Sequence, residues 1–203
     1  MSPGRTANRV YDLLKAQIMD GFRRPGERLD PARLAVRLST SATPVRDALH
    51  QLLGERLVEA WPREGFKVPV PTEAALRDLY RWHGDLTGLL LRGRKSGARP
   101  RSSLPPADSP PDKARVLFVA IAQAFGHEEF RHAIDQAQDR LHRARRAEAQ
   151  VFTDYFDELR SLSEAWSSGR LANLRRQLER YHRRRHLHVA EIVAKMIAPN
   201  SQV

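Results

Sequence analysis

The chain has 203 residues, of which 35 are Lys or Arg and 24 are Asp or Glu, and its formal net charge is +11. This length leaves room for one sizeable domain or for two small ones, and we expect two. The basic excess favours an anionic partner, with nucleic acid the leading candidate. The absence of cysteine excludes disulfides, a thiol nucleophile and cysteine-ligated zinc.

The N-terminal sequence MSPGRTANRVYDLL lacks the apolar core of a signal peptide. The longest apolar run, around residues 86–91, is far shorter than the roughly 20 residues that span a bilayer. We therefore expect no membrane association and a cytoplasmic location. Basic residues exceed acidic ones in residues 1–70 and in the remainder, so charge alone does not locate a binding face.

Three helices are predicted before residue 55. Apolar residues fall at the spacing of one helix face in residues 8–20, and Gly21 follows where a left-handed residue commonly ends a helix. A second helix is expected after Asp30, a capping residue, with Pro31 at its first position.

The third helix is predicted from the stretch TPVRDALHQL. Thr43 is expected to cap this helix and Pro44 to open it, so that its first turn is rigidly aimed. Its predicted buried stripe consists of Val45, Ala48, Leu49, Leu52 and Leu53.

Two short β-favourable segments, LVEAW (57–61) and GFKVPV (65–70), follow the third helix and are separated by residues 62–64. This arrangement predicts a hairpin. Three helices followed by a hairpin are typical of a winged helix-turn-helix domain, which we assign to residues 1–71. We further predict a mainly α fold, with an all-α helical bundle over residues 72–203.

The bundle is predicted from helical periodicity that begins at residue 72 and continues with one large break. The break, residues 94–113, is rich in Pro, Ser and charge, and is predicted to be a mobile loop. The predicted helices cover residues 75–91, 114–125, 128–152, 155–166 and 171–197.

The second helix of a helix-turn-helix pair enters the major groove of double-stranded DNA with its first turn toward the bases. Arg46 lies on that turn, opposite the buried stripe, where a guanidinium suits a guanine edge or a phosphate. An exposed arginine is often merely solvated, but the order of the elements favours DNA contact. The predicted DNA-binding residues are Arg33, Ser41, Thr43, Pro44, Arg46, His50, Arg63, Gly65 and Lys67.

The segment PGERLDPARLAVRLSTSATPVRDALHQLLGERLVEAWPREGFKV resembles the DNA-binding domain of GntR-type bacterial transcription regulators, whose pattern includes PGxxL, an apolar helix, TPVREAL and a wing. The helical remainder is similar to the FCD effector domain of the FadR-like subfamily. The resemblance implies a homodimeric repressor or activator that binds a palindromic operator and changes its DNA affinity when a small metabolite enters the helical domain; we expect a ligand-responsive repressor. The chain departs from the pattern at Ala42, where an arginine is common, and at Arg56, where a glycine is common. Arg56 is therefore expected to adopt a left-handed conformation.

Many FCD domains bind a divalent metal through Asp and His side chains from three helices. At the aligned positions this chain has Ala114, Phe118, Leu159 and Tyr181, with His182 one residue beyond the last, and His83 replaces an arginine common in the family. We therefore expect no metal and no cofactor. The predicted effector pocket is more apolar than usual, suits an apolar small molecule, and is lined by His83, Ala114, Phe118, Leu159 and Tyr181. The alternative is that these side chains only fill the core of a constitutive DNA-binding dimer whose helical domain serves assembly.

His182 and His186 share a helix face at the spacing of zinc ligands, with His188 close by. The surrounding arginines favour a solvated basic face over a metal site. Two basic runs of the bundle, residues 140–148 and 175–185, could bind a phosphate backbone, but we expect them to remain solvated beside Asp and Glu. None of the common nucleotide-binding or hydrolase motifs is present. We therefore predict no catalytic residues and a protein that is not an enzyme.

Overall fold

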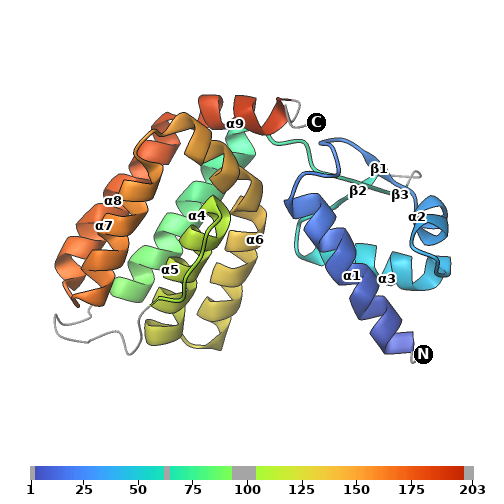
Figure 1. Cartoon of the computed structure of the whole chain (residues 1–203), viewed down its shortest axis with the longest axis horizontal. Coiled ribbons are helices and arrows are strands. Elements are labelled where there is room, and N and C mark those ends of the chain that lie inside the picture. The colour runs from blue at the N-terminus through green and yellow to red at the C-terminus, as the bar shows by residue number, and fades with distance from the viewer. Residues whose placement is uncertain (1–2, 62–64, 93–103, 199–203) are drawn as a thin grey trace. The chain divides into compact units, whose positions relative to one another are not determined.

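The computed structural model describes residues 3–61, 65–92 and 104–198 (Figure 1). The chain divides into two compact units, Met1–Pro71 and Thr72–Val203. The first is a winged helix-turn-helix domain and the second is a helical bundle, so the predicted fold class is confirmed. The predicted wing tip, residues 62–64, and most of the predicted loop, residues 94–103, lie outside the described residues.

Three helices form the body of the first unit: α1 (Pro3–Met19), α2 (Pro31–Arg37) and α3 (Ala42–Gly54). Helix α1 begins five residues earlier than its apolar pattern indicates, and Gly21 follows it with the predicted left-handed backbone, at a φ of 81°. Asp30 caps α2 as predicted, because its carboxylate accepts hydrogen bonds from the amides of Ala32 and Arg33.

The start of α3 differs from the prediction. Ser41, not Thr43, is the N-cap, and the helix begins at Ala42. Pro44 is the third residue of the helix, which is tolerated because the first four amides of a helix have no intrahelical acceptor. Four residues of the predicted stripe, from Val45 to Leu52, are buried, whereas Leu53 is only partly buried.

The sheet of the first unit has three antiparallel strands in the order β1-β3-β2. Strands β2 (Glu59–Trp61) and β3 (Gly65–Lys67) form the predicted hairpin. Strand β1 (Arg28–Leu29) was not predicted, because two residues leave no alternating pattern to read. It places Leu29 opposite Phe66, and both side chains are buried.

The core of the first unit is apolar. It joins one face of α1, the inner faces of α2 and α3, and the hairpin. In the described part of this unit, Arg23 is the only charged residue that is buried, and it bonds to Gln17 and Glu27. The buried apolar residues that lie on α1 and α3 are Val10, Leu14, Ile18, Val45, Ala48, Leu49 and Leu52.

Six helices form the described part of the second unit. The predicted ranges hold to within a few residues for the first four, although α5 begins at residue 110, inside the predicted loop. Ser109 caps this helix and prolines occupy its first two positions, a normal helix start. The helices are α4 (Glu73–Leu91), α5 (Pro110–Phe125), α6 (Glu128–Val151), α7 (Tyr155–Ser167), α8 (Leu171–Leu187) and α9 (Val189–Ile197).

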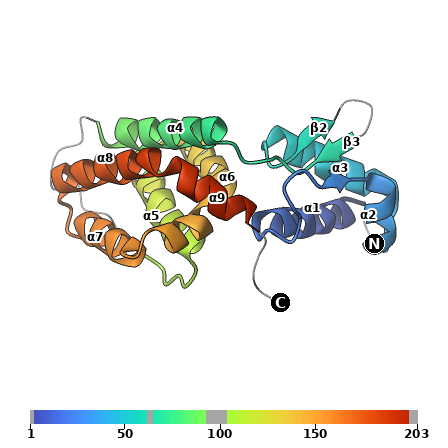
Figure 2. The same cartoon turned by 90° about the horizontal axis from the view of Figure 1, so that it is seen from above.

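The predicted single helix over residues 171–197 is wrong. The chain breaks at His188, whose φ of −104° and ψ of 19° end α8. The break turns α9 across one end of the bundle, where it packs on α6 and α4 (Figures 1 and 2). Val189, Ile192 and Val193 become buried there, which a straight continuation of α8 would not achieve.

Candidate functional site

The outward face of α3 carries most of the predicted DNA-binding side chains. Thr43, Arg46 and His50 are exposed and recur at helical spacing on one side, while the opposite side is buried in the core. Ser41 and Arg33 are exposed as well, and Pro44 is partly buried. The structure therefore brings the predicted residues of α2 and α3 to the surface of one helix-turn-helix pair.

The turn between α2 and α3 fixes this arrangement. Ser39 has a left-handed φ of 51° and lies between the last turn of α2 and Ser41. The side chain of Ser41 makes no capping hydrogen bond to α3. The first amides of α3 thus lack the side-chain acceptor that Asp30 provides for α2, and such amides are suited to binding phosphate.

The hairpin is connected to α3 through His50. The ring of His50 packs edge-on against Phe66 of β3, with 5.0 Å between the ring centroids. Gly65 is exposed at a φ of 98°. Lys67 forms an ion pair with Glu59 at 3.3 Å, so its contact with a phosphate would require exchange of this partner. The predicted Arg63 lies outside the described residues.

The five residues of the predicted effector pocket are all buried. His83, Phe118 and Tyr181 meet in the middle of the bundle, with 4.3 Å between the rings of His83 and Phe118 and 5.6 Å between those of Phe118 and Tyr181. Ala114 and Leu159 belong to the same core.

The prediction of an unusually apolar interior is wrong, because ionised side chains lie in it. Glu148 of α6 accepts hydrogen bonds from Arg145 at 2.9 Å, from Arg185 at 2.9 Å and from the hydroxyl of Tyr80 at 2.5 Å. The side chains of Arg145, Glu148 and Arg185 are at most 1% exposed. We call Tyr80, Arg145, Glu148, Tyr181 and Arg185 the buried ion cluster.

The cluster remains ionised. Burial alone would raise the pKa of Glu148, but Arg145 and Arg185 together hold that pKa below its usual value. Burial and the nearby Glu148 raise the pKa of Tyr80 well above its usual value, so that its phenol stays protonated and donates. The guanidinium of Arg185 also stacks on Tyr181, 3.3 Å from the ring centroid.

The residues of the cluster continue the apolar stripes of their helices, and this was the sequence signal for them. On α6 the buried positions recur at spacings of three and four and include Arg145 and Glu148. On α8 the same rule leads from three leucines to Tyr181 and Arg185. The prediction that residues 140–148 and 175–185 remain solvated is therefore wrong for Arg145, His182 and Arg185, which are buried.

A chain of hydrogen bonds runs beside the cluster through two histidines. Nδ1 of His182 lies 2.7 Å from the carbonyl of Leu178 and must carry a hydrogen. If His182 is neutral, its Nε2 accepts from Nδ1 of His83 at 2.8 Å, and Nε2 of His83 accepts from Gln138 at 2.7 Å. Each histidine therefore carries its hydrogen on Nδ1.

Both histidines are held neutral. Burial lowers the pKa of His182 to about 3, and burial followed by the neighbouring His182 and arginines lowers that of His83 well below its usual value. Within the described residues, no group of three or more His, Asp or Glu side chains is placed to hold a metal ion.

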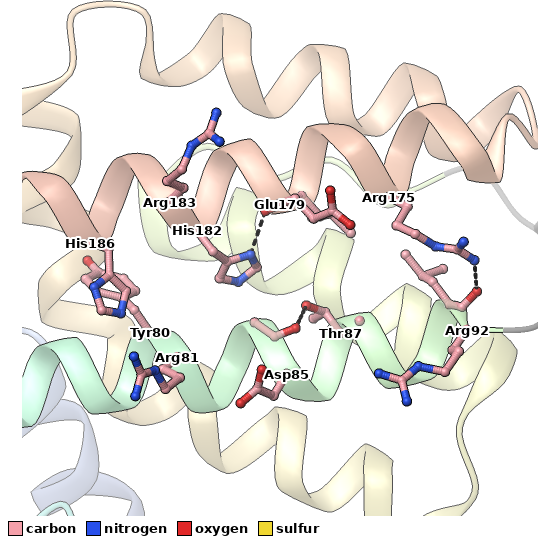
Figure 3. Close-up of a pocket in the computed structure, with 14 residues that line it drawn as sticks. Tyr80, Arg81, Asp85, Thr87, Arg92, Arg175, Glu179, His182, Arg183 and His186 are labelled. Carbon is pink, nitrogen blue, oxygen red and sulfur yellow. Dashed lines mark hydrogen bonds between the residues drawn. The ribbon is translucent and has the colours of Figure 1, made fainter.

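A groove of about 450 Å³ is lined by residues of α4 and α8, which pack on each other (Figure 3). Charged side chains of both signs lie along it, including Arg81 and Asp85 from α4 and Glu179 and Arg183 from α8. His182 and Tyr80 also line the groove. Since Tyr80 donates to Glu148, the groove adjoins the buried ion cluster.

Comparison with known proteins identifies the first unit. Residues 6–68 match the sequence pattern of a protein family described as "Bacterial regulatory proteins, gntR family". These residues therefore form a helix-turn-helix domain of the GntR family.

Two curated relatives match over part of the chain. The uncharacterized HTH-type transcriptional regulator YdhC of Bacillus subtilis (strain 168) is 32% identical over 71 residues, which are 35% of this chain and 32% of that protein. The HTH-type transcriptional repressor GlaR of Escherichia coli (strain K12) is 32% identical over 81 residues, or 40% and 37% of the two chains. The matched part thus spans about a third of each relative.

Two solved structures share the fold over nearly the whole chain. A GntR-type transcriptional regulator from Rhodococcus sp. RHA1 has a TM-score of 0.73 at 20% identity and covers 92% of this chain and 98% of its own. McbR/YncC of E. coli has a TM-score of 0.64 at 19% identity, with 94% and 99% covered. In the described part of the chain, every helix is too short or too polar to cross a membrane.

Proposed function

We propose that the chain is a ligand-responsive transcriptional repressor that binds a palindromic DNA operator as a homodimer. The observation that carries this proposal is the exposed row of Thr43, Arg46 and His50 on the second helix of a GntR-family helix-turn-helix pair. In this geometry the first turn of α3 lies in the major groove, where the guanidinium of Arg46 can bond to a guanine edge.

The other contacts in the proposal are to the DNA backbone and fix the position of α3. Ser41 and the first amides of α3 face a phosphate, Arg33 lies on the preceding helix, and the wing adds Gly65 and Lys67. The methyl side chain of Ala42 has no hydrogen-bond donor or acceptor, so Arg46 carries a larger share of direct readout than in relatives with an arginine at that position.

The homodimer is supported by the outer face of α4. Trp82 is 49% exposed and Leu89 is 45% exposed, and these residues lie seven positions apart on one side of the helix. Two aromatic and aliphatic side chains on one face provide apolar surface for self-association. Arg81 and Asp85 are exposed beside this face, and in a two-fold contact Arg81 of one copy would be placed to pair with Asp85 of the other.

We further propose that the second unit is an FCD-like effector domain of the FadR-like subfamily that works without a metal ion. Support comes from the six-helix bundle and from the lack of metal-binding side chains at Ala114, Phe118, Leu159 and Tyr181. The alternative, a constitutive DNA-binding dimer, is favoured by the complete burial of these side chains in the core. A small molecule that binds the second unit and changes the DNA affinity of the chain would support the effector domain over the constitutive dimer.

The test is a fluorescence-anisotropy titration of the full chain against its own upstream intergenic DNA and a scrambled duplex, over a series of salt concentrations. Specific binding should persist at salt concentrations that abolish binding to the scrambled duplex. Arg46→Ala should weaken specific binding about five- to a hundredfold, since one good base contact contributes about 1–3 kcal/mol.

Arg160→Ala is the matched control, because Arg160 is an exposed arginine of α7 with a side chain that is 68% exposed. It should leave the affinity unchanged. Equal binding of the Arg46→Ala variant and the wild type would overturn the assignment of α3. Equal and steeply salt-dependent binding to both duplexes would show phosphate attraction only.

A further inference from the structure

The groove between α4 and α8 carries an excess of positive charge (Figure 3). Its charged side chains are Arg81, Asp85, Arg92, Arg175, Glu179 and Arg183. Four of them are arginines and two are carboxylates, which leaves two positive charges without a counter-charge in the groove. An ion pair between Arg81 and Asp85 of two copies would not change this excess, because it removes one charge of each sign.

The two histidines that line the groove add no charge at neutral pH. Burial lowers the pKa of His182 to about 3. The pKa of His186 is also lowered, first by burial and then by the nearby Arg81 and Arg77. The positive excess therefore comes from the arginines alone and is permanent, because a guanidinium does not lose its proton in proteins.

Three of the four arginines are available to a ligand. Within the described residues, the side chains of Arg81, Arg92 and Arg183 form no ion pair and no hydrogen bond. All three are exposed. A ligand that binds them would therefore not have to break an existing contact of the protein.

Arg175 is held in place at one end of the groove. Its Nη2 donates to the carbonyl oxygen of Leu91 at 2.5 Å, and this bond covers a carbonyl at the end of α4 that would otherwise repel an anion. Its Nε is buried and has no hydrogen-bond partner within the described part of the chain. Figure 3 shows Arg92 at the same end of the groove, so two guanidinium groups from different segments lie there.

The floor of the groove is open beside this pair of arginines. Gly84 and Gly88 lie one helical turn apart on α4 and both line the groove. His182 covers Gly84, because a Cβ atom there would lie 3.2 Å from its Cγ, whereas a Cβ atom at Gly88 would meet no atom within 4 Å. The volume of about 450 Å³ lies in the range of small-molecule sites, about 300–1,000 Å³.

We propose that this groove binds a phosphate monoester of a small molecule, with the phosphate held by Arg92 and Arg175 beside Gly88. A phosphate monoester carries close to two negative charges at neutral pH and has three strong acceptor oxygens. It therefore matches the charge excess and can accept from donors of two segments at once. A carboxylate is planar and carries only one charge, so it matches the groove less well.

The inference goes beyond the proposed function. The groove lies between two helices and is lined by charged side chains, whereas the predicted effector pocket lies in the core. Binding of the phosphate monoester does not require that the ligand change the DNA affinity of the chain.

The experiment uses the full chain without DNA in a phosphate-free buffer, with phenyl phosphate as the probe. Benzoate keeps the ring but carries a carboxylate, dimethyl phosphate has the single charge of a DNA phosphate, and inorganic phosphate lacks the organic group. Isothermal titration calorimetry measures binding, and ¹⁵N-labelled arginine reports the Nε–H resonance of Arg175. Phenyl phosphate should bind saturably and shift that resonance, and each of the three controls should bind at least about tenfold more weakly.

Two variants test the position of the site. Arg92→Ala removes an exposed donor and should weaken phenyl phosphate binding about ten- to a hundredfold. Gly88→Leu fills the opening without changing any charge, and it should abolish binding while the helix gains propensity. Arg176→Ala is the matched control, because Arg176 is an exposed arginine of α8 that does not line the groove, and it should leave the affinity unchanged.

The inference is overturned if phenyl phosphate does not bind, if any of the three control compounds binds as tightly, or if the Arg175 resonance stays unchanged. Wild-type affinity of Arg92→Ala or of Gly88→Leu would overturn it too. An equal loss of affinity in Arg176→Ala and Arg92→Ala would show diffuse attraction to surface charge instead of a site. Because no DNA is present, a negative result leaves DNA binding by α3 intact, and a failed DNA titration leaves this site intact.

Discussion

The two units of the chain place their charged side chains in opposite ways. In the first unit the core is apolar and the residues proposed to meet DNA, such as Arg46, are exposed. In the second unit Arg145, Glu148 and Arg185 lie inside the core. A side chain that meets a large external partner must remain at the surface, whereas a charged side chain inside a core needs a partner of opposite charge beside it.

The two units are also stabilised by different interactions. The first unit depends on apolar burial, on the cap at Asp30 and on backbone conformations in its turns. The second unit depends in addition on a charge balance that is complete only when every partner is present. Removing one partner from such a buried set is much more damaging than removing one from a surface pair.

The largest expected effect is therefore that of Glu148→Gln. The variant keeps an acceptor for Tyr80 but leaves two buried arginines without their shared carboxylate, and we expect a loss of about 3–5 kcal/mol in the free energy of unfolding. Urea denaturation measures the loss, and hydrogen exchange followed by peptide mass should assign it to the second unit.

Asp157→Asn provides the control for that experiment, because the Arg160–Asp157 pair is about two-thirds exposed on both sides. It should change the free energy of unfolding by less than about 0.5 kcal/mol. A Glu148→Gln variant as stable as this control would show that the cluster does not stabilise the bundle.

An intermediate effect is expected on acidification. The pKa of His182 falls to about 3 and that of His83 lies well below its usual value, because burial disfavours their charged forms. In the unfolded chain both titrate near about pH 6.5, so between about pH 6.5 and 3 the unfolded state binds more protons. Above about pH 6.5 these histidines therefore cost the folded state nothing through ionisation, and below that pH the free energy of unfolding declines as the pH falls.

The decline should reach at most about 1.4 kcal/mol per pH unit for each histidine. Urea denaturation between about pH 7 and 5 separates this effect from the titration of Glu148, whose pKa is about 4.3 in the unfolded chain. His83→Gln should reduce the slope of the second unit by about half. A free energy of unfolding that stays constant over this range would contradict the assignment of two neutral buried histidines.

The smallest effect is expected in the first unit, from Arg56→Gly. Arg56 follows α3 with a φ of 58°, a conformation that costs a residue with a side chain about 1 kcal/mol or more. Glycine removes this cost but adds entropy to the unfolded chain, so we expect a net gain of about 0.5 kcal/mol, measured by urea denaturation. Gln51→Gly, on the exposed face of α3, should instead lose about 1 kcal/mol. A loss of stability in Arg56→Gly would argue against a strained turn.

Most of the first unit could be predicted from the sequence because its signals are local. Asp30 caps the helix that it precedes, Gly21 ends α1, and the left-handed Arg56 follows from the place of a glycine in the related pattern. The wrong prediction in this unit, the residue that caps α3, also concerns local structure. Thr43 and Ser41 are both good capping residues, and the spacing alone did not show which one lies outside the helix.

The interior of the second unit could not be predicted in the same way. Arg145 and Arg185 lie on different helices and meet at Glu148 and at the ring of Tyr181. In sequences as rich in arginine as those of α6 and α8, a buried arginine resembles its exposed neighbours. Arg185 continues the buried stripe of α8 that contains Tyr181, and this position was the available signal that Arg185 is buried. The signal could not be interpreted without Glu148, its partner on α6.

Gly84 has a consequence for the evolution of this bundle. A Cβ atom at this position would lie 3.2 Å from Cγ of His182, closer than most natural contacts, so a side chain at residue 84 would displace the imidazole by a few tenths of an ångström. Among homologous sequences, residues 84 and 182 should therefore covary. Lineages that replace the glycine by a larger residue should also have exchanged the histidine for a smaller one, and with it the hydrogen bond to His83.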